Sequence, residues 1–329
     1  MSIINSDFSP PWWLANGHLQ TLLPRLLYRK RPFQGRWQTF TLSDGDMLDL
    51  CWHEHALASP TRPLLVIFHG LEGSVDSPYV WQLMQAAKNQ QWDSVVMHFR
   101  GCGPRQLNRL ARAYHSGDSG DARELLDYLR QQNPQRPLLA CGFSLGGNML
   151  AKLLSEKPAV PLSGAVVCAA PLDLYAAAER IDQGFSKIYR RYLLTPLKQK
   201  FQRKQALGII TAEHPLAKVE VSSMRSFWQF DDKITAPLHG FASIDDYYTQ
   251  ASAKPRLKQV QIPLHIIHAK DDPFMTAAVI PTANELAPAT TYELSQRGGH
   301  MGFIDFQRGH FRSWLPDRIC RVLNEFLTP

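Results

Sequence analysis

The sequence predicts an α/β fold: a mostly parallel sheet with helices on both faces and a helical insertion in the second half of the chain. Two observations lead to this prediction. Short, strongly apolar runs alternate with segments of helical spacing along most of the chain, and the stretch 172–255 interrupts that alternation. With 329 residues, of which 44% are hydrophobic, the chain can bury a large core and does not resemble a disordered polymer.

The predicted strands are the apolar runs. A hairpin comes first, because residues 37–42 and 47–52 flank Asp44 and Gly45, a dipeptide typical of tight β-turns, and we expect this antiparallel pair to open the sheet. The following runs are rich in leucine or β-branched residues and suit strands buried on both faces: 64–68, 94–99, 138–141, 164–169 and 264–268, with a further strand-like pattern at 291–294.

Helical spacing fills most of the intervals between these runs. Apolar residues three and four positions apart predict helices around 80–87, 125–129 and 149–154. The same pattern returns at 319–326, just after Pro316, and proline suits the first turn of a helix. Strands that alternate with helices in this way predict a parallel sheet.

The stretch 172–255 is too long for a plain crossover and is rich in Lys, Arg and aromatic residues. The sequence therefore predicts three parts: an N-terminal arm at 1–36, a body formed by 37–171 and 256–329, and a helical cap at 172–255. One cap segment has the spacing of a basic amphipathic helix, with Phe185, Ile188, Tyr189, Tyr192 and Leu193 on one face and Lys187, Arg190 and Arg191 on the other. Such a helix packs on the body with its charges in solvent, or makes transient contact with anionic lipid or an acidic substrate.

Charge and cysteine content narrow the functional classes. The net charge of +7 is spread along the chain, so it is a mild indication of anionic partners, and no nucleic-acid partner is expected. No run approaches the roughly 20 apolar residues of a membrane span, and the first residues lack the basic flank and apolar centre of a signal peptide. The five cysteines are widely spaced and mostly lie in apolar runs, which favours reduced thiols in a cytoplasmic protein with at most peripheral membrane contact.

The clearest chemical motif is Gly142-Phe143-Ser144-Leu145-Gly146, which lies between a predicted strand and a predicted helix. A nucleophilic serine on such a sharp turn requires small neighbours, because larger ones would clash in the strained elbow. Ser144 is therefore the candidate nucleophile. The alternative is a glycine-rich turn with an idle serine.

A nucleophilic serine needs a base and an acid that orients the base, in the chain order Ser, Asp or Glu, His. Two downstream loops follow predicted strands, where active-site residues collect in open α/β sheets. One loop carries His300, the candidate base, whose two preceding glycines free the backbone to aim the ring inward; the alternative is a surface histidine. The other carries Asp271 and Asp272. We favour Asp272 as the acid because Pro273 holds it extended, with Asp271 as the alternative.

An oxyanion hole in this arrangement takes one backbone N–H from the residue after the serine and another from the loop after an earlier strand. These residues are Leu145 and, in the segment His69-Gly70-Leu71, Leu71. His69 precedes Ser144 and follows a buried strand, so we expect it to be structural. The alternative for this loop is an ordinary tight turn.

These motifs resemble those of the YheT-like branch of the α/β-hydrolases, which also contains ABHD-type lipid esterases and yeast medium-chain ethyl-ester synthases. The resemblance runs nearly from end to end. The segments that carry it are HGLEGS at 69–74, FRGCG at 99–103, GFSLGGN at 142–148, HAKDDP at 268–273, GGHMGF at 298–303, the arm at 11–21 and cap residues between 230 and 248. The resemblance implies an α/β-hydrolase fold and a charge relay of Ser144, Asp272 and His300.

Other signals do not change this interpretation. The segment GDSG at 117–120 resembles the nucleophile loop of chymotrypsin-like proteases but lacks the following glycine. Ser119 is better placed to start a helix, with Asp121 and Glu124 as its capping box. No metal-ligand spacing, P-loop or dinucleotide fingerprint follows any predicted strand, so neither a metal nor another cofactor is expected.

The sequence thus predicts a serine hydrolase that cleaves a small-molecule carboxylic ester, with a short to medium acyl chain or a lipid-like structure, through an acyl-enzyme. Two alternatives stay open. An acyltransferase would use the same acyl-enzyme with an alcohol in place of water, and a binding protein would keep the fold without turnover.

Overall fold

The computed structural model describes residues 2–53, 61–104 and 107–327. They contain a nine-stranded sheet in the order β1-β9-β8-β7-β6-β4-β5-β3-β2. Its strands are β1 (Ser2–Asn5), β2 (Arg36–Thr41), β3 (Met47–Trp52), β4 (Leu64–Phe68), β5 (Asp93–Met97), β6 (Leu138–Phe143), β7 (Gly164–Cys168), β8 (Leu264–Ala269) and β9 (Thr290–Ser295). Neighbours from β1 through to β5 pair in parallel, whereas β3 pairs antiparallel with both β5 and β2. The predicted α/β fold with a mostly parallel sheet is confirmed.

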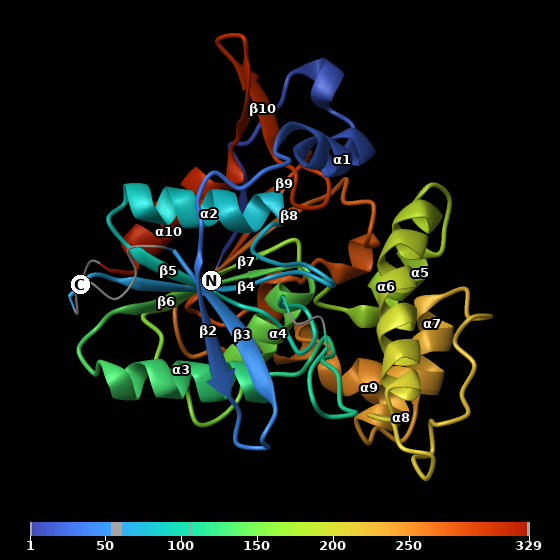
Figure 1. The fold of residues 1–329 in the computed structure, drawn as a ribbon. Coiled ribbons are helices and arrows are strands. Elements are labelled where there is room, and N and C mark those ends of the chain that lie inside the picture. Colours follow the sequence, from blue (N-terminus) through green and yellow to red (C-terminus); the bar gives the residue numbers. More distant parts are fainter. Residues whose placement is uncertain (1, 54–60, 105–106, 328–329) are drawn as a thin grey trace.

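Helices cover both faces of this sheet (Figure 1). On one side lie α2 (Pro78–Asn89) and α10 (Leu315–Glu325), and on the other α3 (Gly120–Gln132) and α4 (Leu145–Leu154). Successive side chains of a strand point to opposite faces. In β4, Leu65 and Ile67 therefore pack with α2 and α10, while Leu64, Val66 and Phe68 pack with α3 and α4.

Two strand predictions need correction. The hairpin around Asp44 and Gly45 forms as β2 and β3, but it does not open the sheet, because β1 precedes it and pairs with β9 at the opposite edge. A second hairpin, β10 (Ile304–Gln307) with β11 (His310–Ser313), was not expected either. Strands of four residues give too short an alternation to be distinguished from loops.

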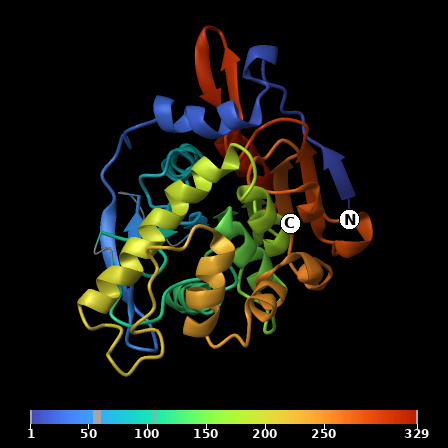
Figure 2. The ribbon, with the colours of Figure 1, turned by 90° about the vertical axis from the view of Figure 1, so that its right-hand side faces the viewer.

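All regular structure described between residues 172 and 255 is helical. It comprises α5 (Leu174–Ile181), α6 (Ser186–Ala206), α7 (Phe227–Phe230), the π-helical turn η2 (Asp231–Thr235), α8 (Ala236–Leu238), α9 (Ile244–Ala251) and the start of η3 (Lys254–Gln259). These helices stand to one side of the sheet, with the long α6 crossing in front of it in Figure 2. The helical character predicted for this segment is therefore found, and the division of the chain into arm, body and cap stays a prediction.

The remaining helices are η1 (Trp12–Leu14), α1 (Gly17–Leu27), η4 (Ala277–Val279) and η5 (Ala283–Glu285). α1 lies beside the β10–β11 hairpin (Figures 1 and 2). None of the helices described in the ranges above is long and apolar enough to cross a membrane.

The predicted capping box at the start of α3 is wrong. Ser119 does occupy the N-cap position, but its hydroxyl bonds to Glu156 and caps no helix amide. Glu124 accepts hydrogen bonds from the amide and hydroxyl of Ser43, at 2.7 and 2.9 Å. Asp121 pairs with the buried guanidinium of Arg100. Partners distant in sequence have displaced the local capping contacts that the spacing predicts.

Candidate active site

Ser144 is the single residue between the end of β6 and the start of α4. Its backbone adopts φ 50° and ψ −121°, a strained conformation for a residue with a side chain. Two glycines make this turn possible. A Cβ at Gly142 would lie 2.5 Å from the carbonyl oxygen of Gly146, and a Cβ at Gly146 would lie 2.4 Å from that of His69. The local geometry is that of a nucleophile elbow.

The side chains of Ser144, His300 and Asp272 form one hydrogen-bonded line. His300 Nε2 lies 3.0 Å from Ser144 Oγ, and His300 Nδ1 lies 2.9 Å from Asp272 Oδ2. An ionised carboxylate can only accept hydrogen bonds, so Nδ1 carries the proton and Nε2 is left to accept from the serine hydroxyl. The three residues follow β6, β9 and β8, all at the C-terminal ends of parallel strands.

The two adjacent aspartates have different contacts. Asp272 uses one oxygen for His300 and accepts the Phe274 amide at 2.8 Å with the other. Asp271 instead accepts a hydrogen bond from the Gly299 amide at 2.9 Å, so it contacts the backbone of the loop rather than the imidazole. Burial raises the pKa of Asp271, against the lowering effect of the Gly299 amide. The structure places Asp272, and not Asp271, against the ring.

The backbone amides of Leu71 and Leu145, the candidate oxyanion hole, can donate hydrogen bonds to a bound group. Leu145 is the first residue of α4, where a backbone N–H has no acceptor within the helix. No acceptor among the described residues takes a hydrogen bond from either amide. The loop that carries Leu71 is fixed on both sides, because Gly70 donates to the hydroxyl of Tyr79 and Glu72 donates to that of Tyr114, at 3.0 and 2.9 Å.

His69 has the contacts of a structural residue, as we expect from the sequence. Its Nε2 accepts a hydrogen bond from the Phe99 amide, and its Nδ1 donates to the Gly70 carbonyl at 2.7 Å. Burial, with a smaller contribution from neighbouring His98, lowers the pKa of His69 to about 3. The ring therefore stays neutral and holds the Leu71 loop in place.

From the sequence we expect the cap and the N-terminal arm to shape an apolar acyl pocket, but not that α1 supports the loop of His300. The His300 amide donates to Thr21 Oγ1 at 2.9 Å, and the Thr21 hydroxyl donates to the Gly17 carbonyl at 2.7 Å. The buried side chain of Gln20 bonds both backbone groups of Ile304, at 2.7 and 2.9 Å. The available signal was the arm segment 11–21, which carries part of the family resemblance but no recognised chemical motif.

A stack of rings holds the imidazole from one side, which the sequence also did not indicate. The Phe274 ring is stacked on that of His300, with centroids 3.9 Å apart and planes at 4°. Tyr189 of α6 packs on Phe274, and its hydroxyl lies 3.1 Å from His18 Nδ1. These contacts fix the plane of the imidazole and leave its Nε2 edge to Ser144.

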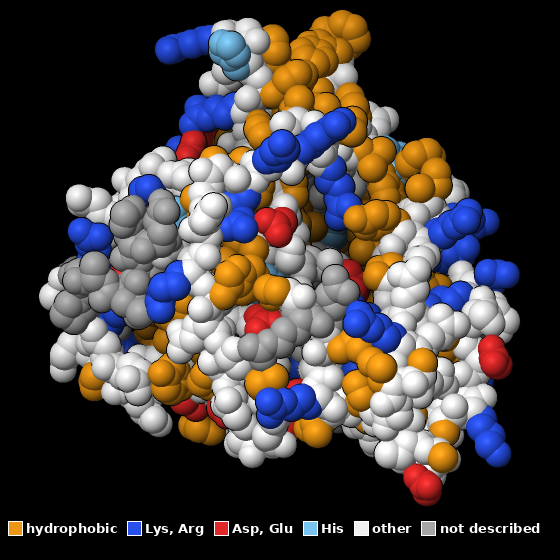
Figure 3. Space-filling model, in the orientation of Figure 1, with side chains coloured by type: hydrophobic (Ala, Val, Ile, Leu, Met, Phe, Trp, Pro, Cys, Tyr) orange, Lys and Arg blue, Asp and Glu red, His pale blue; other side chains and the backbone are white. Residues whose placement is uncertain are grey.

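Two hollows meet at Ser144 and His300. One is a cavity of about 620 Å³, its open mouth included, with a mostly apolar lining that contains Leu174, Ala177, Ala178, Ile181, Leu193 and Met275. The other is a groove of about 1400 Å³ between α1, α2 and α6, visible as a hollow in Figure 3. Their size and lining suit an apolar small molecule.

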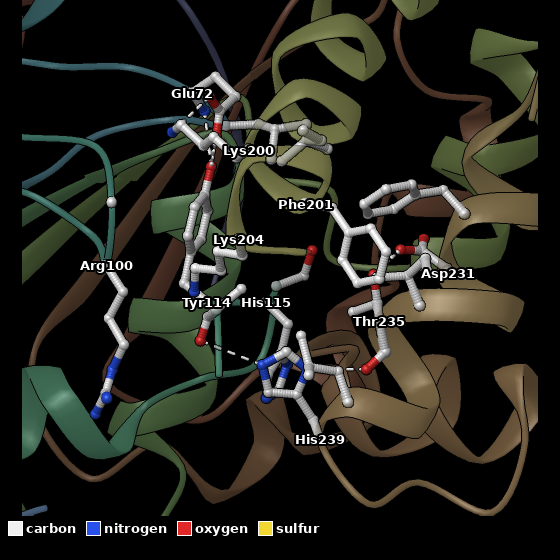
Figure 4. A pocket seen from close by; sticks show the side chains of 18 of the residues that line it. Glu72, Arg100, Tyr114, His115, Lys200, Phe201, Lys204, Asp231, Thr235 and His239 are labelled. Carbon is white, nitrogen blue, oxygen red and sulfur yellow. Dashed lines mark hydrogen bonds and ion pairs between the residues drawn. The ribbon is translucent and has the colours of Figure 1, made fainter. Parts of the chain in front are cut away.

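A further cavity of about 810 Å³ adjoins Leu71 and Leu145 and is partly lined by α6, α7 and α8 (Figure 4). Glu72 and Lys200 lie together at one end of it as an ion pair of 2.7 Å, and His239 lies at the other end. Among the residues that the structure describes, no three His, Cys, Asp or Glu side chains are placed to hold a metal ion. The expectation that no cofactor is needed stays a prediction.

The comparisons with known proteins all point to one family. The sequence profile of the family described as "alpha/beta hydrolase fold" matches residues 63–307. YheT of Escherichia coli (strain K12), which carries an esterase name, is 44% identical over 324 residues, covering 98% of this chain and 94% of its own. Phospholipase ABHD3 of Homo sapiens is 27% identical over 314 residues, covering 92% and 75%.

One further sequence relative and one solved structure are also similar to this chain. "Medium-chain fatty acid ethyl ester synthase/esterase 2" of Saccharomyces cerevisiae is 29% identical over 287 residues, covering 80% of this chain and 62% of its own. The solved structure of the Pyrococcus furiosus esterase Pf2001 superposes with a TM-score of 0.55 at 13% identity, over 90% and 92% of the two chains, which supports the fold alone. The chain therefore belongs to the α/β-hydrolase family, among the esterase- and lipase-type members that resemble YheT.

Proposed function

We propose that this protein is a serine carboxylesterase that cleaves short- to medium-chain or lipid-like esters through an acyl-enzyme. The observation that carries the proposal is the hydrogen-bonded line from Ser144 through His300 to Asp272, at a strained elbow beside the amides of Leu71 and Leu145. The names of the relatives, an esterase and a phospholipase, agree with this class of reaction.

In the first half of the reaction, Ser144 Oγ attacks the carbonyl carbon of the ester while His300 Nε2 takes the hydroxyl proton. The carbonyl oxygen becomes an anion and accepts hydrogen bonds from the amides of Leu71 and Leu145. The bond to the alcohol oxygen then breaks, and His300 gives its proton to that oxygen. The acyl group stays on Ser144.

In the second half, His300 takes a proton from a water molecule whose oxygen attacks the acyl carbon. The bond to Ser144 Oγ breaks, the serine recovers a proton from His300, and the carboxylic acid leaves. Asp272 accepts the Nδ1 proton's hydrogen bond throughout, which fixes the tautomer and stabilises the imidazolium without proton transfer to the carboxylate. The apolar cavity and the groove meet at the serine, so they give room to the two sides of a scissile ester.

Active-site labelling tests this proposal. A fluorophosphonate probe should label the purified protein, and Ser144→Ala should abolish both the label and the hydrolysis of activated esters. Ser119→Ala, in the segment that resembles another serine motif, is the matched control and should label normally. Equal labelling of a folded Ser144→Ala variant would overturn the assignment.

Acyl transfer is the second candidate, favoured by the yeast relative whose name includes an ester synthase. It requires the same acyl-enzyme, with an alcohol that attacks in place of water. The ratio of ester to acid formed in the presence of ethanol or glycerol separates the two activities. A folded protein that neither reacts with the probe nor turns over a broad panel of esters would instead favour the third alternative, a non-catalytic binding protein.

A further inference from the structure

Large apolar side chains are exposed around the mouth of the groove that leads to Ser144. Of the fifteen large hydrophobic side chains exposed among the described residues, eight lie on η1, α1, the first half of α6 and the β10–β11 hairpin, and a ninth, Phe185, directly precedes α6. They include Trp12, Leu22, Leu26, Ile188, Tyr192 and Phe311. Trp12 is 89% exposed, the highest value in this group. A concentration of exposed apolar side chains of this kind marks an interaction surface.

This surface is continuous with the candidate active site. Leu22 and Leu26 of α1 and Ile188 and Tyr192 of α6 line the groove that also contains Ser144. Figure 3 shows hydrophobic side chains on both rims of the hollow, with Lys and Arg side chains among them. Figures 1 and 2 both place α1, the hairpin and the first turns of α6 at the same end of the molecule.

The charged side chains on these elements are almost all positive. The sequences of α1 and α6 contain no acidic residue, and the hairpin contains one, Asp305. Exposed cations without an ion pair to a described acidic side chain surround the apolar side chains: Arg25, Arg29, Lys30, Lys187, Arg191 and Arg308. The guanidinium of Arg25 lies over the Tyr192 ring at 4.6 Å, so cation and aromatic ring belong to one surface.

We propose that η1, α1, the first half of α6 and the β10–β11 hairpin form a docking surface for an anionic phospholipid membrane. Tryptophan and leucine side chains insert at the depth of the headgroups, and the surrounding lysines and arginines attract the anionic lipids. Trp and Leu side chains bordered by Lys and Arg are the pattern of segments that lie on an anionic membrane surface, which favours a membrane over a protein partner. The inference rests on the proposed function in one respect: it gives the route by which a lipid-like ester enters the groove.

Vesicle flotation with the full chain tests the docking. Vesicles of diether phosphatidylcholine containing about 30% diether phosphatidylglycerol resist ester cleavage, so binding is measured without turnover. We expect binding to these vesicles, weak binding to phosphatidylcholine alone, and a loss of binding as salt rises from about 0.1 to about 0.5 M.

Matched variants locate the surface. Trp12→Ala should lower the partition coefficient about tenfold, through lost apolar insertion. Lys187→Gln combined with Arg191→Gln should lower it roughly 25-fold on anionic vesicles, at about fivefold for each cation. Leu207→Ala, at an exposed site at the other end of α6, and Lys218→Gln, at an exposed site beyond that helix, are the controls and should bind as the wild type does.

Several outcomes would overturn the inference. Equal binding to neutral and anionic vesicles, or unchanged binding by the Trp12 and cation variants, contradicts it. If the wild type does not bind vesicles and Trp12→Ala dissociates a dimer in sedimentation, the surface is an interface between copies of the chain.

The docking and the catalytic activity can be tested separately. Trp12→Ala should keep the wild-type kcat/KM on a soluble activated ester. Loss of docking with intact labelling of Ser144 would therefore refute the docking alone, and docking without labelling would refute the proposed esterase alone.

Discussion

The two neighbouring aspartates, Asp271 and Asp272, show that a shift of one residue along the chain changes the contacts of a carboxylate completely. Asp272 bonds the ring of His300, while Asp271 bonds the amide of Gly299, one residue before it. The two carboxylates are chemically identical, so Asp272 was favoured only by the restraint of Pro273 and by the family resemblance. Their difference comes from contacts with a loop 28 residues away. Such contacts leave no local pattern in the sequence.

Substitution at these two positions should therefore have unequal effects. Asp272→Asn should reduce kcat about 10³- to 10⁴-fold, because an amide no longer fixes the productive imidazole tautomer, with a smaller change in KM. Asp271→Asn should be mild in kcat, since an amide oxygen still accepts the Gly299 amide. Steady-state kinetics on an activated ester measure both. The acid assignment is wrong if Asp271→Asn is the crippling change in folded protein.

At the scale of elements, α6 is connected to the loop of the candidate oxyanion hole. The Glu72 carboxylate follows Leu71 and is buried, where it accepts from the Tyr114 hydroxyl at 2.8 Å and pairs with Lys200 of α6 at 2.7 Å. Burial alone would lower the pKa of Lys200, but Cys102 and Glu72 beside it raise the pKa, so the ammonium stays charged. The ion pair thus joins a helix of the predicted cap to the residue next to a catalytic amide of the proposed mechanism.

Removing this ion pair should act on catalysis through the position of Leu71. Lys200→Met leaves Glu72 buried without its cation, and we expect kcat to fall about tenfold with little change in KM, since loss of one oxyanion donor altogether costs about 10²- to 10³-fold. Lys198→Met is the control, because the Lys198 ammonium bonds only the carbonyls of Ser222 and Met224 among the described residues. A lower melting temperature with unchanged kcat would show that the ion pair is merely structural.

The sequence predicted some helices and missed others, for a physical reason. The amphipathic spacing at Phe185 to Leu193 correctly indicated a helix, but not that Tyr189 would be buried on Phe274 while Ile188 stays exposed. The sequence of α1 gave no clear prediction of a helix, because its apolar side chains face a groove and a loop rather than a continuous core. Periodicity reports which side of a helix is apolar and is silent about what covers it.

At the scale of the whole molecule, Glu293 of β9 joins separate parts of the chain. Its buried carboxylate bonds His265 of β8 and Ser6 at 2.7 Å each, and pairs with Arg318 of α10 at 2.8 Å. Burial alone would raise the pKa of Glu293, but the hydrogen bonds from His265, Arg318 and Ser6 outweigh it and lower the pKa to about 2.

This carboxylate should contribute to acid stability. Because its pKa is lower in the folded than in the unfolded state, its contribution is present above about pH 4.5 and is lost as the pH falls towards about 2. Glu293→Gln should therefore lower the free energy of unfolding at pH 7 by about 2 to 3 kcal/mol and flatten its fall between about pH 4.5 and 2. Urea unfolding at a series of pH values measures this. A parallel pH profile for the two proteins would contradict the assignment.

The overall architecture was readable from the sequence because parallel strands buried on both faces leave continuous apolar runs, as in Leu64 to Phe68. The elbow was readable because its strain restricts residue types within five positions. The edges of the sheet were not, since β1 gains its stability from β9, 289 residues away at Ser2 and Thr291. The hairpin at 304–313 is likewise held by Trp13 and Gln20 of the distant arm.

The pairing of β1 with β9 also sets an order in time. During synthesis the first strand leaves the ribosome long before its partner β9, whereas β6 and β7, which pair with each other, follow one another closely in the chain. Between Ser144 and His300 lie about 155 residues, or roughly 8 to 30 s of translation at the usual rates of about 5 to 20 residues per second. During that interval the nascent chain contains Ser144 but not yet His300. The loop that Thr21 supports in the folded protein has not yet been synthesised either. The protein therefore gains its proposed chemistry only when the last part of the chain docks on the first.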